Sequence, residues 1–204
     1  MNDIRDKVVL ITGAGRGCGR ILAAAFAERG AYVAANDISP VNVDEVVNEI
    51  IKKGGRAKAY IEDVAKKVGA QFIINQVEDD FGRIDVLINH AAVEPRLPLL
   101  DMDEWDWHRV LDVNLTGTFL MTQSVGRVMR AQGGGIIINL ITEVAPEQST
   151  EAAFAASMEG RKGFTQQAAL ELGPYGIHIH ALQGDRDQIV EKVFALLAER
   201  SEEP

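Results

Sequence analysis

The sequence has a single cysteine, Cys18, and this scarcity excludes a disulfide within the chain. A chain without disulfides fits the reducing cytoplasm, which is the location that we expect. Only four histidines are present, and they show no metal-ligand spacing with the cysteine, so no metal site is predicted. No apolar run is long enough to span a membrane, and the amino end lacks the pattern of a secretory signal.

Positive charge is also scarce, because 21 lysine and arginine residues stand against 30 aspartate and glutamate residues, for a net charge of −9. A chain this acidic is repelled by phosphate backbones and anionic lipid, so nucleic acid and membranes are excluded as general partners. The length of 204 residues and the hydrophobic content of 47% are typical of one globular domain with a full core. We therefore expect residues 1–204 to form a single domain.

The amino end of the sequence contains an apolar run followed directly by a glycine cluster. Val8–Thr12 is predicted as a strand, Gly13–Gly19 as a tight turn, and the alanine-rich run that follows as a helix. Glycines let the backbone lie close to a bulky anion, and the helix start offers N–H groups and a positive dipole to a pyrophosphate. A second strand ends at Asp37, 18 residues after Gly19, near the distance at which an acid meets an adenosine ribose. The alternative is a plain strand–turn–helix unit without a ligand.

Strand-like and helix-like segments alternate along almost the whole chain, which predicts an α/β fold with helices on both faces of a parallel sheet. The expected strand order of this doubly wound sheet is 3-2-1-4-5-6, with a ligand crevice at the carboxyl ends of the first and fourth strands. Apolar periodicity predicts later strands at 84–89, 136–141 and 177–182, and later helices at 103–130, 151–172 and 186–200.

Five motifs match one known family in residue type and position. They are Thr12-Gly13-x-x-x-Gly17-x-Gly19, Asp63-Val64, Asn89-His90-Ala91-Ala92, Asp112-Val113-Asn114-Leu115 and Glu171-Leu172-Gly173. From Lys7 to about Gly184 the sequence therefore resembles the short-chain dehydrogenase/reductase family. The resemblance implies a Rossmann-type dinucleotide-binding domain with the strand order given above and a nicotinamide dinucleotide as its cofactor.

The resemblance also implies which residues contact the cofactor. The positions are Gly13, Arg16, Gly17, Cys18, Gly19, Asp37, Asp63, Val64, Asn89 and Ala91. A carboxylate at Asp37 accepts hydrogen bonds from a free ribose 2′-hydroxyl and repels a 2′-phosphate, which favours NAD over NADP. Arg16 is a counter-signal, because a basic residue in this turn assists a 2′-phosphate. We interpret Cys18 as a small apolar filler beneath the turn.

The catalytic residues of the family are a serine, a tyrosine, a lysine four residues after the tyrosine, and an asparagine behind them. Counting back from the Glu171-Leu172-Gly173 motif puts Phe154 at the tyrosine position and Met158 at the lysine position. Thr142, at the serine position, keeps a hydroxyl, and Asn114 is retained. Phenylalanine has no ionisable proton and methionine has no charge, and general acid–base catalysis is worth about 10²–10⁴ in rate. We therefore expect carbonyl or alcohol chemistry to be impaired or absent.

The carboxyl end departs from the family as well. Gln183-Gly184-Asp185 leads directly into the final helix, where the family continues with a substrate-covering loop and helix and a seventh strand. We expect this lid and the seventh strand to be missing. Their loss weakens both water exclusion and substrate selection.

Few residues are candidates for a substitute proton donor or a further ligand contact. His90 stands beside the expected crevice, and its alternative role is a structural replacement for the asparagine that is usual there. Arg161 and Lys162 follow Met158 by three and four residues and are interpreted as a solvated helix face. The others are interpreted as exposed loop charges or as core and interface residues: Glu143, Glu147, Glu151, Trp105 and Trp107.

Three functions remain open from the sequence. The preferred one is an NAD(H)-binding protein that is a poor or inactive oxidoreductase. The second is an active oxidoreductase whose proton comes from water held by Thr142 and Asn114, or from His90. The third is a structural or regulatory partner that no longer binds a dinucleotide. The resemblance also implies a homodimer through the helices near 103–130 and 151–172.

Overall fold

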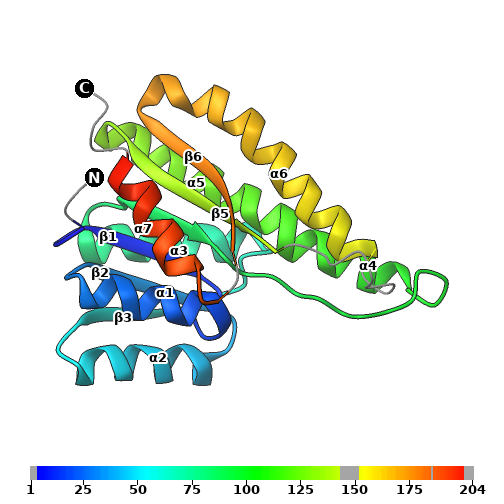
Figure 1. The fold of residues 1–204 in the computed structure, drawn as a ribbon, viewed down its shortest axis with the longest axis horizontal. Helices are drawn as coiled ribbons and strands as arrows, with labels where there is room; N and C mark the ends of the chain where they lie inside the picture. Colours follow the sequence, from blue (N-terminus) through cyan, green and yellow to red (C-terminus); the bar gives the residue numbers. More distant parts are fainter. Residues whose placement is uncertain (1–3, 143–151, 185, 200–204) are drawn as a thin grey trace.

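The computed structural model describes residues 4–142, 152–184 and 186–199 (Figure 1). The acidic candidates Glu143, Glu147 and Glu151 lie outside the described residues. The elements are, in order, β1 Val8–Thr12, α1 Gly17–Glu28, β2 Tyr32–Asp37, α2 Pro40–Lys52, β3 Arg56–Ile61, α3 Lys67–Phe81, β4 Val86–Asn89, α4 Glu104–Leu111, a π-helical turn Asp112–Thr116, α5 Gly117–Gln132, β5 Gly135–Ile141, α6 Ala152–Leu172, a 3₁₀ turn Gly173–Tyr175, β6 Ile177–Gln183 and α7 Ile189–Glu199.

The described strands form one six-stranded sheet in the order β3-β2-β1-β4-β5-β6, and the predicted strand order is confirmed. All five strand pairs are parallel. The chain reverses its direction of travel across the sheet between β1 and β4, which are neighbours although two strands and three helices separate them in sequence. A ligand crevice forms at the carboxyl ends of the strands where such a reversal occurs.

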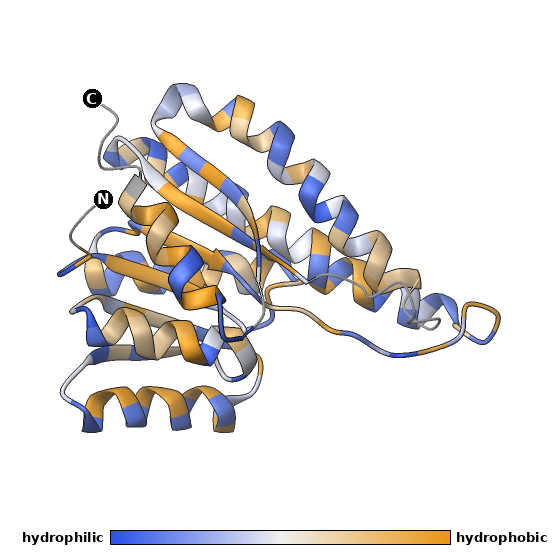
Figure 2. Cartoon of the chain, viewed as in Figure 1, coloured by the Kyte–Doolittle hydropathy of each residue, from blue (hydrophilic) through white to orange (hydrophobic). Residues whose placement is uncertain are grey.

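Both faces of the sheet are covered by helices, because the strands are apolar on both sides. One face packs against α1, α2 and α7, with Phe26, Val46 and Val193 among the buried contacts. The other face packs against α3, α5 and the carboxyl half of α6, where Ile73 and Val125 are buried. Figure 2 shows the result as hydrophobic strands between helices of mixed polarity. This three-layer arrangement leaves the strand ends as the place where polar groups converge.

The predicted helical region at 103–130 is present as α4 and α5, which a π-helical turn at Asp112–Thr116 joins. The N–H of Gly117 donates to the carbonyl of Asp112, five residues earlier. The carbonyl oxygen of Asn114 accepts hydrogen bonds from the side chains of Thr118 and Arg161. Widened turns of this kind often mark functional sites. Apolar periodicity does not predict it, because the turn is distinguished by its hydrogen bonds, one partner of which lies on α6.

Candidate functional site

The glycine turn between β1 and α1 is a cradle that side chains would fill. Gly13 and Gly17 have φ values of +66° and +53°, which L-residues rarely adopt. A Cβ on Gly19 would overlap the carbonyl oxygen of Gly13 and lie 2.6 Å from Nδ1 of His90. Helix α1 begins at Gly17, so the N–H groups of its first turn face the cradle without intrahelical partners. The turn therefore fits a pyrophosphate, as the sequence predicts.

Asp37, at the end of β2, is held by the backbone around it. Its Oδ2 accepts a hydrogen bond from the N–H of Gly15 at 2.9 Å, and its Oδ1 accepts one from the N–H of Ser39 at 2.9 Å. A Cβ on Gly15 would lie 2.8 Å from that Oδ2, so only glycine allows this approach. The carboxylate thus has a fixed position beside the glycine turn, as a residue that receives a ribose hydroxyl requires.

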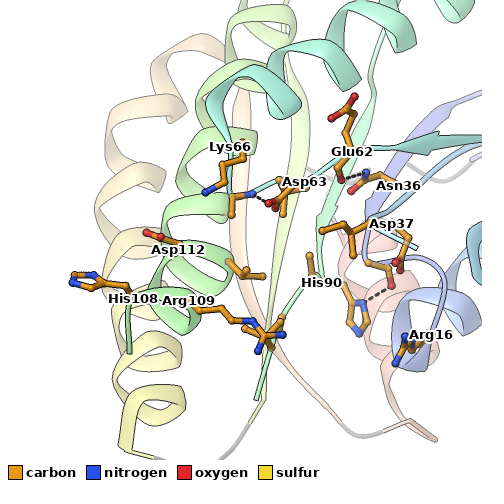
Figure 3. A pocket seen from close by; sticks show the side chains of 18 of the residues that line it. Arg16, Asn36, Asp37, Glu62, Asp63, Lys66, His90, His108, Arg109 and Asp112 are labelled. Carbon is orange, nitrogen blue, oxygen red and sulfur yellow. Dashed lines mark hydrogen bonds between the residues drawn. The ribbon is translucent and has the colours of Figure 1, made fainter. Parts of the chain in front are cut away.

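An open cleft of about 580 Å³ runs along this edge of the sheet. Figure 3 shows Asp37, His90 and Arg16 on one side of it and residues of α4 on the other. Of the predicted cofactor contacts, the cleft is lined by Gly13, Arg16, Asp37, Asp63, Val64 and Ala91. Several further lining residues belong to none of the five motifs: Asn36, Ile38, Glu62, Lys66, His108 and Arg109. Only their position could have indicated them, because each residue lies next to a motif or within one helical turn of a motif.

Gly17, Cys18, Gly19 and Asn89 are outside the lining of this cleft. Cys18 is partly buried and packs against the core, which agrees with its interpretation as a filler. Asn89 is buried, and its Nδ2 donates to Oγ1 of Thr122 at 3.2 Å and to Oδ1 of Asn139 at 2.8 Å. Asn89 therefore ties β4 to β5 beneath the crevice and has no described contact with the cleft.

The four residues that the resemblance places at catalytic positions, Asn114, Thr142, Phe154 and Met158, belong to the π-helical turn, the end of β5 and α6. Nδ2 of Asn114 donates to Oγ of Ser157 at 3.0 Å, and Ser157 lies on α6 between Phe154 and Met158. Phe154 and Met158 are only 3% and 2% exposed and form a small apolar cluster with Ile141. Thr142, which follows Ile141, is exposed. Burying a side chain such as phenylalanine or methionine stabilises a fold by about 1.5–3 kcal/mol, so this pair is suited to packing.

The chain has three tyrosines, and none of them stands at position 154, which the resemblance gives to a catalytic tyrosine. Tyr32 begins β2 and so lies at the amino end of that strand, where its ring packs against Phe81. Tyr60 is buried on β3 and its hydroxyl donates to Asp80 at 2.7 Å; burial and this carboxylate raise its pKa. Tyr175 follows α6, more than twenty residues after Phe154. A phenolic acid is therefore not present near the carboxyl ends of β4 and β5.

The interpretation of Arg161 as part of a solvated helix face is wrong, because its side chain is buried and only 1% exposed. Its guanidinium makes five hydrogen bonds to backbone carbonyls. Nε and Nη2 donate to the carbonyl of Asn114 at 2.9 and 2.6 Å, and Nη1 donates to that of Leu140 at 2.8 Å. The other two reach the carbonyls of Ala91 at 3.0 Å and Asn89 at 3.5 Å. Charge normally indicates exposure, so no feature of the sequence predicts this burial.

His90 faces the glycine turn, and its Nδ1 lies 3.0 Å from the carbonyl oxygen of Gly13. Burial lowers the pKa of His90, and the cation of Arg161 acts in the same direction, against the raising effect of the Gly13 carbonyl. The native imidazole is therefore neutral near pH 7. Its contact with the turn supports the structural alternative for His90 over a catalytic one.

We expect the His90→Asn variant to lose less stability than the parent when the pH falls from about 7.5 to about 5.5. Below the ordinary pKa of 6.5 the unfolded chain protonates His90 while the native chain does not, so acid favours unfolding. The contribution of His90 to the free energy of unfolding is fully present above its unfolded-state pKa and is lost as the pH falls through its native-state pKa. Urea unfolding at several pH values measures it, with His108→Asn, an exposed histidine, as control. Parallel curves for parent and His90→Asn would contradict this account.

Comparison with known families shows where the chain belongs. The model of the family described as short chain dehydrogenase matches residues 7–184, which is most of the chain. The chain belongs to the short chain dehydrogenase family. A curated member, the 3-oxoacyl-(acyl-carrier-protein) reductase of Synechocystis sp., is 40% identical over 185 residues, which cover 89% of this chain and 74% of that protein.

Solved structures of short chain dehydrogenases share the fold. NAD⁺-bound xylitol dehydrogenase superposes with a TM-score of 0.85 at 32% identity, covering 89% of this chain and 71% of that one. A metagenomic short-chain oxidoreductase in complex with NADP superposes with a TM-score of 0.89 at 28% identity, covering 96% and 91%. The chain therefore has the NAD(P)-binding fold of the family, and its structural neighbours include complexes with either dinucleotide.

In the described ranges, no group of three or more histidine, cysteine, aspartate or glutamate side chains is placed to hold a metal ion. Among the helices that the structure describes, none combines the length and the apolar character that crossing a membrane requires.

Proposed function

We propose that this chain is an NAD(H)-binding short chain dehydrogenase whose carbonyl and alcohol oxidoreductase activity is impaired or absent. One observation carries the proposal: the glycine cradle and a fixed Asp37 are retained, whereas Phe154 and Met158 form a buried, apolar cluster with Ile141 at the end of β5. The first feature fits the cofactor, and the second removes the proton donor and the cation that tunes it. NAD(H), when bound, supplies or accepts the hydride.

In this proposal, different residues of the chain bind different parts of the dinucleotide. The cradle and the start of α1 bind the pyrophosphate, and Asp37 receives the adenosine ribose hydroxyls. Asp63 and Val64 line the cleft where the adenine ring is expected, and Oδ1 of Asp63 is fixed by the N–H of Ala65 at 2.9 Å. The rigid carboxylate of Asp37 favours NAD over NADP, because it repels a 2′-phosphate. Arg16 lines the same cleft and partly offsets this preference.

The proposal that the chain is active through a substitute donor has less support. Oδ1 of Asn114 accepts from the N–H of Val93 at 2.8 Å, and Nδ2 donates to the carbonyl of Val93 and to Ser157. Both Nδ2 donors are thereby used, which leaves little capacity to hold a catalytic water. His90 is directed at the glycine turn. The third function, a partner without cofactor, conflicts with the retained cradle.

A calorimetric titration with NADH tests the binding half of the proposal. We expect saturable binding, since the cradle, Asp37 and Asp63 are all in place. Weaker binding of NADPH is expected in the same experiment because of Asp37. Absence of NADH binding at about millimolar concentration, the upper range of cofactor affinities, would contradict the proposal.

We also propose a homodimer through α5 and α6. A hollow of about 300 Å³ between these helices is lined by Phe119, Phe164 and Leu172, among others. Phe119 is 41% exposed and packs edge-to-face on Phe164, with ring centroids 6.2 Å apart. Leu170, on the same helix pair, is 73% exposed. Light scattering tests the proposal, and a mass of one 22.2 kDa chain would contradict it.

A further inference from the structure

The second half of a bound dinucleotide has a defined place in this fold. A doubly wound sheet binds one mononucleotide half on each side of its switch point. Asp37 ends β2 and takes the adenosine ribose under the proposed function, so the adenosine half lies over β2 and β3. The other half, which carries the nicotinamide, then lies over the carboxyl ends of β4 and β5, on the far side of β1.

Arg161 lies beneath that second half. Its carbonyl partners include Asn89, the last residue of β4, and Leu140, at the end of β5. It also donates to the carbonyl of Ala91 at 3.0 Å, and Ala91 lines the cleft. One peptide group therefore separates the guanidinium from the cleft. The guanidinium itself is 1% exposed, so solvent screens its charge poorly.

Among the residues that the structure describes, no carboxylate is hydrogen-bonded to this guanidinium. An arginine has five N–H donors, and the five hydrogen bonds of Arg161 all go to backbone carbonyls. Burial lowers its pKa to about 10, so it remains a cation at neutral pH. The cleft is also lined by other charged residues: Asp37, Glu62, Asp63, Asp112, Lys66 and Arg109. Of these, Asp37, Glu62 and Asp63 follow β2 and β3 and belong to the adenosine half. That half is chemically identical in the oxidised and reduced cofactors.

We propose that this site selects the reduced cofactor, because the fixed cation of Arg161 opposes the positive charge of the oxidised nicotinamide ring. The inference rests on the proposed function and names its ligand: NADH is bound in preference to NAD⁺. Two unit charges about 10 Å apart at an effective dielectric constant of about 20 change an equilibrium constant by roughly tenfold. A protein with this preference and no proton donor holds NADH without consuming it, so its occupancy follows the ratio of NADH to NAD⁺.

Calorimetry with NADH, NAD⁺ and ADP-ribose tests the inference on the parent chain. ADP-ribose contains the adenosine half without a nicotinamide and serves as the reference. We expect NADH to bind about tenfold more tightly than NAD⁺, and NAD⁺ to bind more weakly than ADP-ribose. Equal affinities for NADH and NAD⁺ would overturn the inference while leaving the proposed function intact. If none of the three ligands binds, the proposed function itself fails.

Three variants show whether Arg161 is the cause. Arg161→Gln removes the charge and keeps two donors, so the NADH to NAD⁺ preference should fall to within about threefold. Arg161→Lys keeps the charge and should keep the preference. Lys162→Gln removes a charge from the next, more exposed residue, which pairs with Glu159, and should also keep it. A merely structural role of Arg161 would weaken all three ligands together, and an unchanged preference in Arg161→Gln would overturn the inference. If that variant does not fold, the order of the three ligands on the parent decides.

Discussion

Restoring tyrosine and lysine together, as Phe154→Tyr with Met158→Lys, should raise carbonyl reduction by about 100-fold or more over the parent chain. General acid–base catalysis is worth about 10²–10⁴ in rate, and these two side chains return the proton donor and the cation that lowers its pKa. Asn114 and Thr142 are already in place. NADH consumption at about 340 nm with a panel of small ketones and aldehydes measures the gain.

A lysine at position 158 would be buried and close to another cation. Met158 is 2% exposed, and Arg161 lies three residues later on the same face of α6. Two cations so placed repel each other, so part of the gain is expected only when Arg161→Leu is added. Each single reversion serves as a control and should gain much less, because tyrosine and lysine act as a unit. A folded double and triple variant without any turnover would contradict the account of a disabled site.

The Gly19→Ala variant should weaken NADH binding by at least about tenfold, because a Cβ there overlaps the carbonyl oxygen of Gly13 and lies 2.6 Å from His90. The turn must open to relieve this overlap, which displaces the N–H groups that receive the pyrophosphate. The same calorimetric titration with NADH measures the loss.

Gly163→Ala is the matched control for that variant. A Cβ on Gly163 meets nothing within 4 Å, and the residue lies within α6, where alanine is the better helix former. It should therefore bind NADH like the parent and be slightly more stable. Equal binding by the parent and Gly19→Ala would show that the cradle does not hold the dinucleotide.

The sheet could be predicted because its determinants are local. The apolar strands, the glycine turn and the acid at Asp37 are each read within a few residues, and the right-handed crossover rule then restricts the topology. The assignment of Phe154 and Met158 to the tyrosine and lysine positions stays a prediction, which depends on a helix without a gap before the Glu171-Leu172-Gly173 motif. These features depend on sequence spacing and not on contacts between distant elements.

The environment of Arg161 could not be predicted, because it depends on four carbonyls from three distant segments. No pattern within α6 distinguishes a buried arginine that bonds to strand ends from a solvated one. The hydrogen bond between Arg161 and the carbonyl of Asn114, in the π-helical turn, joins residues that are 47 positions apart, so no local pattern predicts it either. The lining of the cleft by Lys66 and Arg109 likewise depends on how α3 and α4 pack around the crevice.

The central claim is that the chain retains a coenzyme pocket but not the side chains that move a proton there. A fluorescence titration with NADH, followed in the same cell by a panel of ketones and aldehydes, tests both halves at once. The account predicts a saturable change in NADH fluorescence that then persists after each carbonyl compound is added. Absence of saturation, or consumption of the bound NADH by the parent chain at about 1 s⁻¹ or faster, the range of ordinary enzymes, would contradict it.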